Sequence, residues 1–156
     1  MPITMLLPRE SILENIRTTL AAVNGAGDYH TKVVTVTRVW TPYELMPPDQ
    51  MPALLVFDSG KDDPKEEAAQ IIQRTMTVEV WGYQRVSEKV DVSTQANYLI
   101  EDIVRCLKAD KCRNRLATWT HFGAIRIYGG WVSNRLVGVI TVVNVAVDYL
   151  YNDPQT

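Results

Sequence analysis

A cluster of acidic residues follows an apolar run in the middle of the chain, and no other segment has residue types so suited to chemistry. The apolar run, residues 53–57, leads directly into a segment that holds five acids: Asp58, Asp62, Asp63, Glu66 and Glu67. Carboxylates at the end of a strand can hold a metal ion or act as general acids and bases. Whether this acidic segment, residues 58–67, is such a site depends on its spacing.

The spacing of the acidic segment matches no metal-binding pattern. A calcium loop starting at Asp58 would have Gly60 where a ligand is needed, Asp63 where glycine is needed and Ala69 where glutamate is needed. Lysines alternate with the acids, and turn-forming residues interrupt them. We therefore expect a solvated loop between two strands that can meet a basic partner surface. The alternative is a small metal-dependent enzyme that uses Asp58, Asp62 and Asp63.

Other candidate sites carry less chemistry. Cys106 and Cys112 have a spacing typical of neither a zinc site nor a redox pair, so we expect ordinary thiols in a reducing compartment. Gly129-Gly130 indicates a bulge in a hairpin, with close approach of a ligand to the backbone as the alternative. The sequence has no nucleophile elbow and no metalloprotease motif. The expectation is a protein without catalytic residues or cofactors.

The composition is that of one globular domain spanning residues 1–156. Apolar residues make up 46% of the chain and charged residues 22%, which is far from the composition of a disordered segment. A formal charge of −2 gives no net attraction to nucleic acid or to acidic membranes. The most apolar segment, residues 136–150, is shorter than the roughly 20 residues that a membrane helix needs. We expect a soluble, untargeted protein without membrane contact.

Hydrophobic periodicity predicts the order α-β-β-β-α-β-β. Two amphipathic helices should pack on one face of a mainly antiparallel sheet, an α+β fold with long projecting strands. The first predicted helix has Pro8 in its first turn, apolar residues recurring from 12 to 23, and Gly25-Ala-Gly27 at its end; the second covers residues 92–107. The predicted strands cover residues 32–40, 53–57, 70–85, 124–132 and 136–151. Leu99, Ile103 and Leu107 should face the sheet, Ser93 should cap the second helix, and residues 133–135 should form a hairpin turn.

Several features favour a protein partner. The proline-rich segment, residues 41–52, either packs over the sheet or offers Tyr43, Met46 and Met51 to a partner. Tyr98 lies on the polar face of the second helix, as a lone exposed tyrosine or as a contact residue. A basic run follows this helix, opposite in sign to the acidic segment. It either forms a solvated face or meets the acidic segment between copies of the chain. Its members are Lys108, Lys111, Arg113 and Arg115.

The layout resembles the tail terminator (tail completion) proteins of long-tailed bacteriophages. The resemblance rests on an opening amphipathic helix that ends at Gly25-Ala-Gly27, and on a proline-led strand, residues 52–57, that runs into Ser-Gly and acids. The long strand at residues 75–83, the helix at residues 99–107 and the closing strand at residues 145–149 complete it. Two segments, residues 41–52 and 111–120, depart from the pattern and leave open which neck component this is.

The resemblance implies a structural virion protein without enzymatic activity. It would be made in the host cytoplasm and form a ring, commonly of six subunits, at the junction of tail and head. One face of the ring would cap the tail tube protein and the other would meet the head-side connector or stopper protein. DNA would pass through the ring without specific binding. The alternative in the same class is another neck or tail protein, either a stopper or a tube-associated protein.

Overall fold

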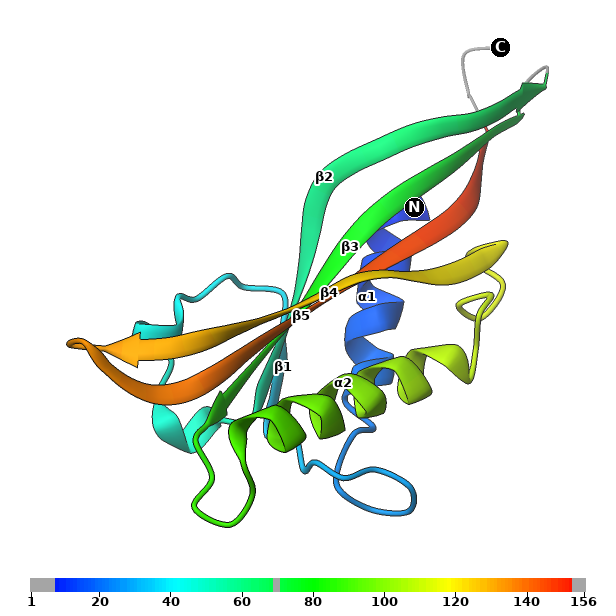
Figure 1. Ribbon diagram of the computed structural model, residues 1–156. Helices are drawn as coiled ribbons and strands as arrows, with labels where there is room; N and C mark the ends of the chain where they lie inside the picture. The colour runs from blue at the N-terminus through cyan, green and yellow to red at the C-terminus, as the bar shows by residue number, and fades with distance from the viewer. Residues whose placement is uncertain (1–7, 69–70, 153–156) are drawn as a thin grey trace, which may run out of the picture.

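The computed structural model describes residues 8–68 and 71–152, with only the backbone described at residues 65–68, 71–72 and 151–152 (Figure 1). Two α-helices, five strands and two short 3-10 helices make up this part of the chain. In chain order the elements are α1 Pro8–Leu20, β1 Thr35–Thr37, η1 Tyr43–Leu45, η2 Pro48–Gln50, β2 Ala53–Ala68, β3 Ile71–Arg85, α2 Val92–Lys108, β4 Trp119–Val132 and β5 Arg135–Asn152.

The five strands form one sheet in the order β1-β2-β3-β5-β4. Strand β1 runs parallel to β2, and every other neighbouring pair is antiparallel. The predicted α+β class and the predicted order of elements are confirmed. Among the described helices, none is long and apolar enough to cross a membrane.

The main core lies between the two helices and one face of the sheet. Alternate residues of the three central strands point to this face, among them Leu54 of β2, Val78 of β3 and Val145 of β5. Buried residues of both helices pack on them, and Leu99, Ile103 and Leu107 are buried as predicted. A smaller cluster on the opposite face joins Leu55 and Tyr83 of the strands to the proline-rich segment. The helices therefore cover one face, and the opposite face is covered only in part.

Element boundaries differ from the sequence prediction where the backbone needed partners that the hydrophobic pattern did not reveal. Strand β2 has 16 residues instead of five, because the long strand β3 needs a partner along nearly its whole length. The acidic segment is therefore part of a strand, and the prediction of a loop was wrong. Helix α2 is capped by Asp91, whose carboxylate accepts a hydrogen bond from the Thr94 amide, and the prediction of a Ser93 cap was also wrong.

Two hairpins project from the sheet in opposite directions (Figure 1). The distal half of strands β2 and β3, called the charged arm below, contains residues 58–68 and 71–79. The tip of the β4/β5 hairpin, called the apolar arm, contains residues 125–140. Its turn at Ser133 and Asn134, predicted from the sequence, has a positive φ at both residues. This is the geometry of the two-residue turns that suit the twist of antiparallel strands.

Candidate assembly interface

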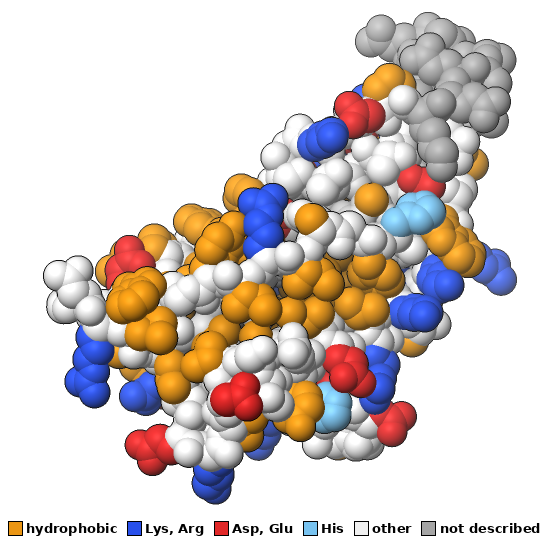
Figure 2. Space-filling model, in the orientation of Figure 1, with side chains coloured by type: hydrophobic (Ala, Val, Ile, Leu, Met, Phe, Trp, Pro, Cys, Tyr) orange, Lys and Arg blue, Asp and Glu red, His pale blue; other side chains and the backbone are white. Residues whose placement is uncertain are grey.

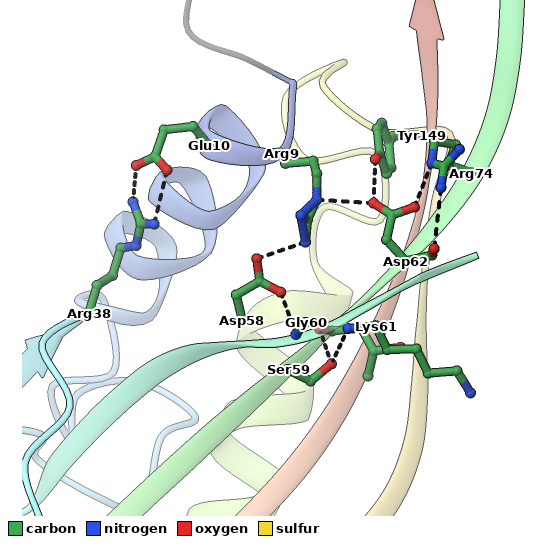
Figure 3. Close-up of polar contacts among 11 residues, drawn as sticks. Arg9, Glu10, Arg38, Asp58, Ser59, Gly60, Lys61, Asp62, Arg74 and Tyr149 are labelled. Carbon is green, nitrogen blue, oxygen red and sulfur yellow. Dashed lines mark hydrogen bonds and ion pairs between the residues drawn. The ribbon is translucent and has the colours of Figure 1, made fainter. Parts of the chain in front are cut away.

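Two of the predicted site acids, Asp58 and Asp62, lie in an ion-pair network at the base of the charged arm (Figure 3). The Asp62 carboxylate lies 2.7 Å from Nε of Arg74 and 3.0 Å from Nε of Arg9, and it accepts a hydrogen bond of 2.5 Å from the Tyr149 hydroxyl. Asp58 accepts a hydrogen bond of 2.7 Å from Arg9 Nη2. The network thus connects the first turn of α1 to three strands, β2, β3 and β5.

These contacts make the acids structural groups. Two arginines occupy the oxygens of Asp62 that a cation would need, and their positive charge opposes cation binding at this position. Within the described part of the chain, no group of three His, Cys, Asp or Glu residues is placed to hold a metal ion. Asp63 points to Lys61 at 3.8 Å and is exposed. The side chains of Glu66 and Glu67 lie outside the described part.

The network also shifts the acidity of its tyrosine. Tyr149 is 1% exposed, and burial together with its hydrogen bond to Asp62 raises its pKa to about 12. The neutral phenol is the form that donates to the carboxylate, because the phenolate has no hydrogen left to donate. Tyr149 therefore holds Asp62 in place as a neutral donor beside the two arginines.

The basic run after α2 divides into exposed and buried members. Lys108 and Arg115 are exposed, and the Lys111 ammonium lies 4.6 Å from the centre of the Trp119 ring. Arg113 is fully buried, and its guanidinium donates to the Leu107 carbonyl at the end of α2. Burial lowers the pKa of this guanidinium. The prediction that Arg113 belongs to an exposed interface was wrong.

The burial of Arg113 follows from the backbone after α2. Residues Arg113, Asn114 and Arg115 all have a positive φ, between 47° and 68°. This left-handed turn folds the chain back against the end of the helix, and it brings the Arg113 side chain beneath its last carbonyls. A run of basic residues in a sequence does not reveal such a turn, since most arginines lie on the surface.

The proline-rich segment is packed onto the apolar arm. Tyr43 and Met46 are buried, and the Tyr43 ring lies over a pair of glycines that face each other across the hairpin, Gly130 of β4 and Gly138 of β5. A Cβ atom at Gly138 would lie 1.8 Å from the Tyr43 hydroxyl oxygen. Tyr43 and Met46 are therefore core residues: the alternative in which this segment packs over the sheet is confirmed for them, and the alternative of a partner interface was wrong. Met51 is partly buried against the same cluster.

The glycine pair also explains Gly129-Gly130 in the sequence. The register of β4 against β5 shifts between Gly130 and Trp131, so the predicted irregularity in the hairpin is confirmed. Without side chains, the two paired glycines leave the space that the tyrosine ring fills. The group that approaches the glycine backbone closely is an aromatic ring of the same chain.

Helix α2 carries one exposed aromatic and one buried acid that anchors a loop. Tyr98 is 41% exposed, as its position predicted, and its ring stacks on His30 at 4.4 Å. Asp102 is fully buried and accepts hydrogen bonds from the backbone amides of His30 and Thr31. This arrangement holds the loop before β1 against α2, and sequence reasoning missed it because an isolated acid on a helix is usually solvated.

Strand β4, an edge strand, carries six exposed large apolar side chains, more than any other element of the described chain. Ile125 and Ile127 are each 47% exposed on the helix face, and Trp131 at the tip is 58% exposed. Figure 2 shows hydrophobic side chains gathered between β4 and α2 and around the apolar arm. A groove beside α2 is lined by Asn97, Ile100, Glu101, Val104, Arg105, Lys108 and Ala109. Apolar surface of this kind is typical of binding sites for other protein chains.

A scan against protein-family models found no match to this chain, and a search of curated proteins found none either.

Proposed function

We propose that this protein is a structural virion component that forms a ring, caps the tail tube of a long-tailed phage and joins it to the head-side connector. The observation that carries the proposal is the exposed apolar edge of β4. An edge strand of 14 residues with large apolar side chains on both faces invites pairing with another chain.

The order of elements and the packing of both helices on one face of the sheet agree with the resemblance to tail terminators. The contacts of the acids best suited to chemistry also support this proposal. Asp58 and Asp62 are neutralised by arginines of the same chain, which is the arrangement of a structural support. The contrasting function, a metal-dependent enzyme, would need these carboxylates free for a cation.

The ring is the part of the proposal that an experiment tests most directly. Purified protein is mixed with phage tail tubes that lack a cap, and the tube ends are imaged by electron microscopy. Light scattering on the protein alone gives its mass over a range of concentrations. We expect ring-shaped caps at one end of the tubes and a mass several times that of the monomer once rings have closed.

A protein that stays monomeric and leaves every tube uncapped would overturn the terminator function. Binding to isolated connectors without binding to tubes would instead place the protein at the stopper position. Activity that depends on a divalent cation, and that is lost on Asp62→Asn, would favour the enzyme.

A further inference from the structure

The outer edge of β2 is protected against pairing with another chain, whereas the edges formed by β1 and by β4 are not. Beyond Leu55, the outer edge of β2 carries lysine, aspartates and Pro64, and its register with β3 shifts twice. Charge, proline and bulges are the features that keep an edge from pairing. The edge of β4 from Ile125 to Val132 has Arg126 as its one charged residue. The β1 edge, residues 34–40, is similarly apolar, with Val34, Val39 and Trp40 exposed.

Residues that pair directly across neighbouring strands form rows that run from one edge of the sheet to the other. The parts of β1 and β4 that are not protected against pairing lie in the same rows. One row runs through Thr35, Ala53, Tyr83, Ile140 and Tyr128, from the β1 edge to the β4 edge. The next rows carry Val36 and Thr37 to Ile127 and Arg126. The apolar stretch of β4 is therefore level with β1.

The strand directions also fit. Strands β1, β2 and β5 run one way, and β3 and β4 run the other way. When a second copy continues the sheet with the same face toward the helices, its β1 lies antiparallel to β4 of the first copy. Antiparallel pairing is the more stable arrangement per residue.

We propose that β4 of one copy pairs with the β1 edge, residues 34–40, of the next copy, so that the sheet continues from subunit to subunit. This inference rests on the proposed ring. On the helix face, Ile127 of one copy meets Val36 of the next. The two arginines of these edges lie on opposite faces of the sheet, Arg38 toward the helices and Arg126 away from them, so like charges do not meet.

The helix layer gives this arrangement its charge complementarity. Helix α1 contacts β1, and its Glu10 and Glu14 face Arg38 on the side away from α2. In the continued sheet this side of α1 approaches the groove beside α2 of the first copy, which Glu101, Arg105 and Lys108 line. Arg105 pairs with Glu101 of the same helix at 2.8 Å, so Lys108 is the base of this groove that would meet the acids of the next copy. The next copy's α1 then covers Ile125 and Ile127, which the first copy's own helices leave exposed. Attraction between these acids of α1 and Lys108 of α2 favours this orientation of the two subunits.

This contact is heterologous, because the two edges that meet are different. A heterologous contact generates a ring when its rotation closes and a filament when it does not. Because the paired residues occupy the same rows, each copy joins the next without a shift along the strands.

Cysteine cross-linking tests this pairing. The exposed native Cys112 is replaced by serine, and Thr35→Cys is combined with Tyr128→Cys in one chain. Within one molecule these positions lie four strand spacings apart, roughly 19 Å, which is too far for a disulfide. We expect oxidation to give a ladder of disulfide-linked oligomers that ends at the subunit number of the ring.

Three matched variants sharpen the result. Each single cysteine should leave the chain monomeric on a non-reducing gel, and Lys61→Cys with Tyr128→Cys should do the same, because the β2 edge is protected. A disulfide-linked dimer from Tyr128→Cys alone would show that β4 pairs with β4 and would overturn the proposal. The absence of a ladder from the Thr35/Tyr128 pair would also overturn it.

The outcome is separable from that of the proposed function. Capped tubes without a ladder would refute the β4–β1 pairing while the ring stands. A ladder without capped tubes would support the pairing and refute the terminator role.

Discussion

The charged arm and the apolar arm are both pairs of antiparallel strands but are stabilised by different means. The charged arm is connected to α1 by arginine–carboxylate pairs around Asp58 and Asp62. The apolar arm is held by an aromatic ring, Tyr43, seated on the glycines of two strands. One arm therefore depends on charge and the other on the fit of side chains.

The difference extends to the edges of the sheet. The charged arm exposes an edge interrupted by Pro64 and two register shifts, whereas the apolar arm belongs to the exposed edge strand β4. A monomer gains nothing from leaving large apolar side chains on a long edge, because such edges aggregate. In the proposed ring, the charged β2 edge would stay in water and the β4 edge would be covered by the next copy.

The largest expected effect is on the apolar arm. Gly138→Ala would place a Cβ atom 1.8 Å from the Tyr43 hydroxyl oxygen and 2.5 Å from the Gln84 carbonyl oxygen. Because backbone and ring must both move, we expect a loss at the upper end of the overpacking range, about 3 kcal/mol, in the free energy of unfolding, measured by urea denaturation.

Gly123→Ala is the matched control, since its Cβ atom would meet Asn144 at 3.4 Å, close to an ordinary contact. We expect a change below about 1 kcal/mol there. Equal losses at the two glycines would mean that Tyr43 does not set the packing of the apolar arm.

A smaller loss is expected from the charged arm. Asp62→Ala removes the acceptor of Arg9, Arg74 and Tyr149, and leaves a largely buried hydroxyl without its partner. The expected loss is about 1–3 kcal/mol in the free energy of unfolding. Asp63→Ala should change it by less than about 0.5 kcal/mol, because Asp63 is exposed and has a distant partner. Two variants of equal stability would refute the network.

The pH dependence of the charged arm provides a third test. Tyr149 has an ordinary pKa of 10.0, which folding raises to about 12, so the folded state holds the proton more tightly than the unfolded chain. The protonated Tyr149 therefore contributes to the free energy of unfolding; this stabilisation is fully present below pH 10 and is lost as the pH rises toward 12. We expect thermal melts of the wild type to fall more steeply over this range than those of Tyr149→Phe. Parallel curves would mean that Tyr149 does not contribute.

The sequence predicted an element correctly where a single stripe of apolar residues determines which face is buried, as in helix α2. Residues Leu99, Ile103 and Leu107 recur at helical spacing, and α2 buries them. The length of β2 was missed because charged residues seldom indicate a strand. The signal that would have found it is the long predicted strand at residues 70–85, whose backbone groups need partners along its length.

Site residues were harder to predict because their surroundings come from distant parts of the chain. Asp62 meets Arg9 and Tyr149, which lie far from it in sequence, so its role depends on the fold. In the sequence, Arg113 cannot be distinguished from its basic neighbours, because its burial depends on the left-handed turn at residues 113–115. Tyr98 was placed correctly, because its exposure depends only on the face of one helix.

The smallest expected effect on the monomer comes from the exposed edge, and it distinguishes the two arms most directly. Ile127→Lys puts a charge on an edge position that is 47% exposed, so we expect a change within about 0.5 kcal/mol in the free energy of unfolding. The same substitution places an ammonium in the apolar contact between copies, where it would lose its water. The mass measured by light scattering should therefore fall toward that of the monomer. Lys61→Ile, the reverse change on the charged arm, should leave the mass of the assembly as it is, because Pro64 and the two bulges still interrupt the β2 edge. If Ile127→Lys assembles like the wild type, the β4 edge is not the contact surface, and the difference between the arms concerns folding alone.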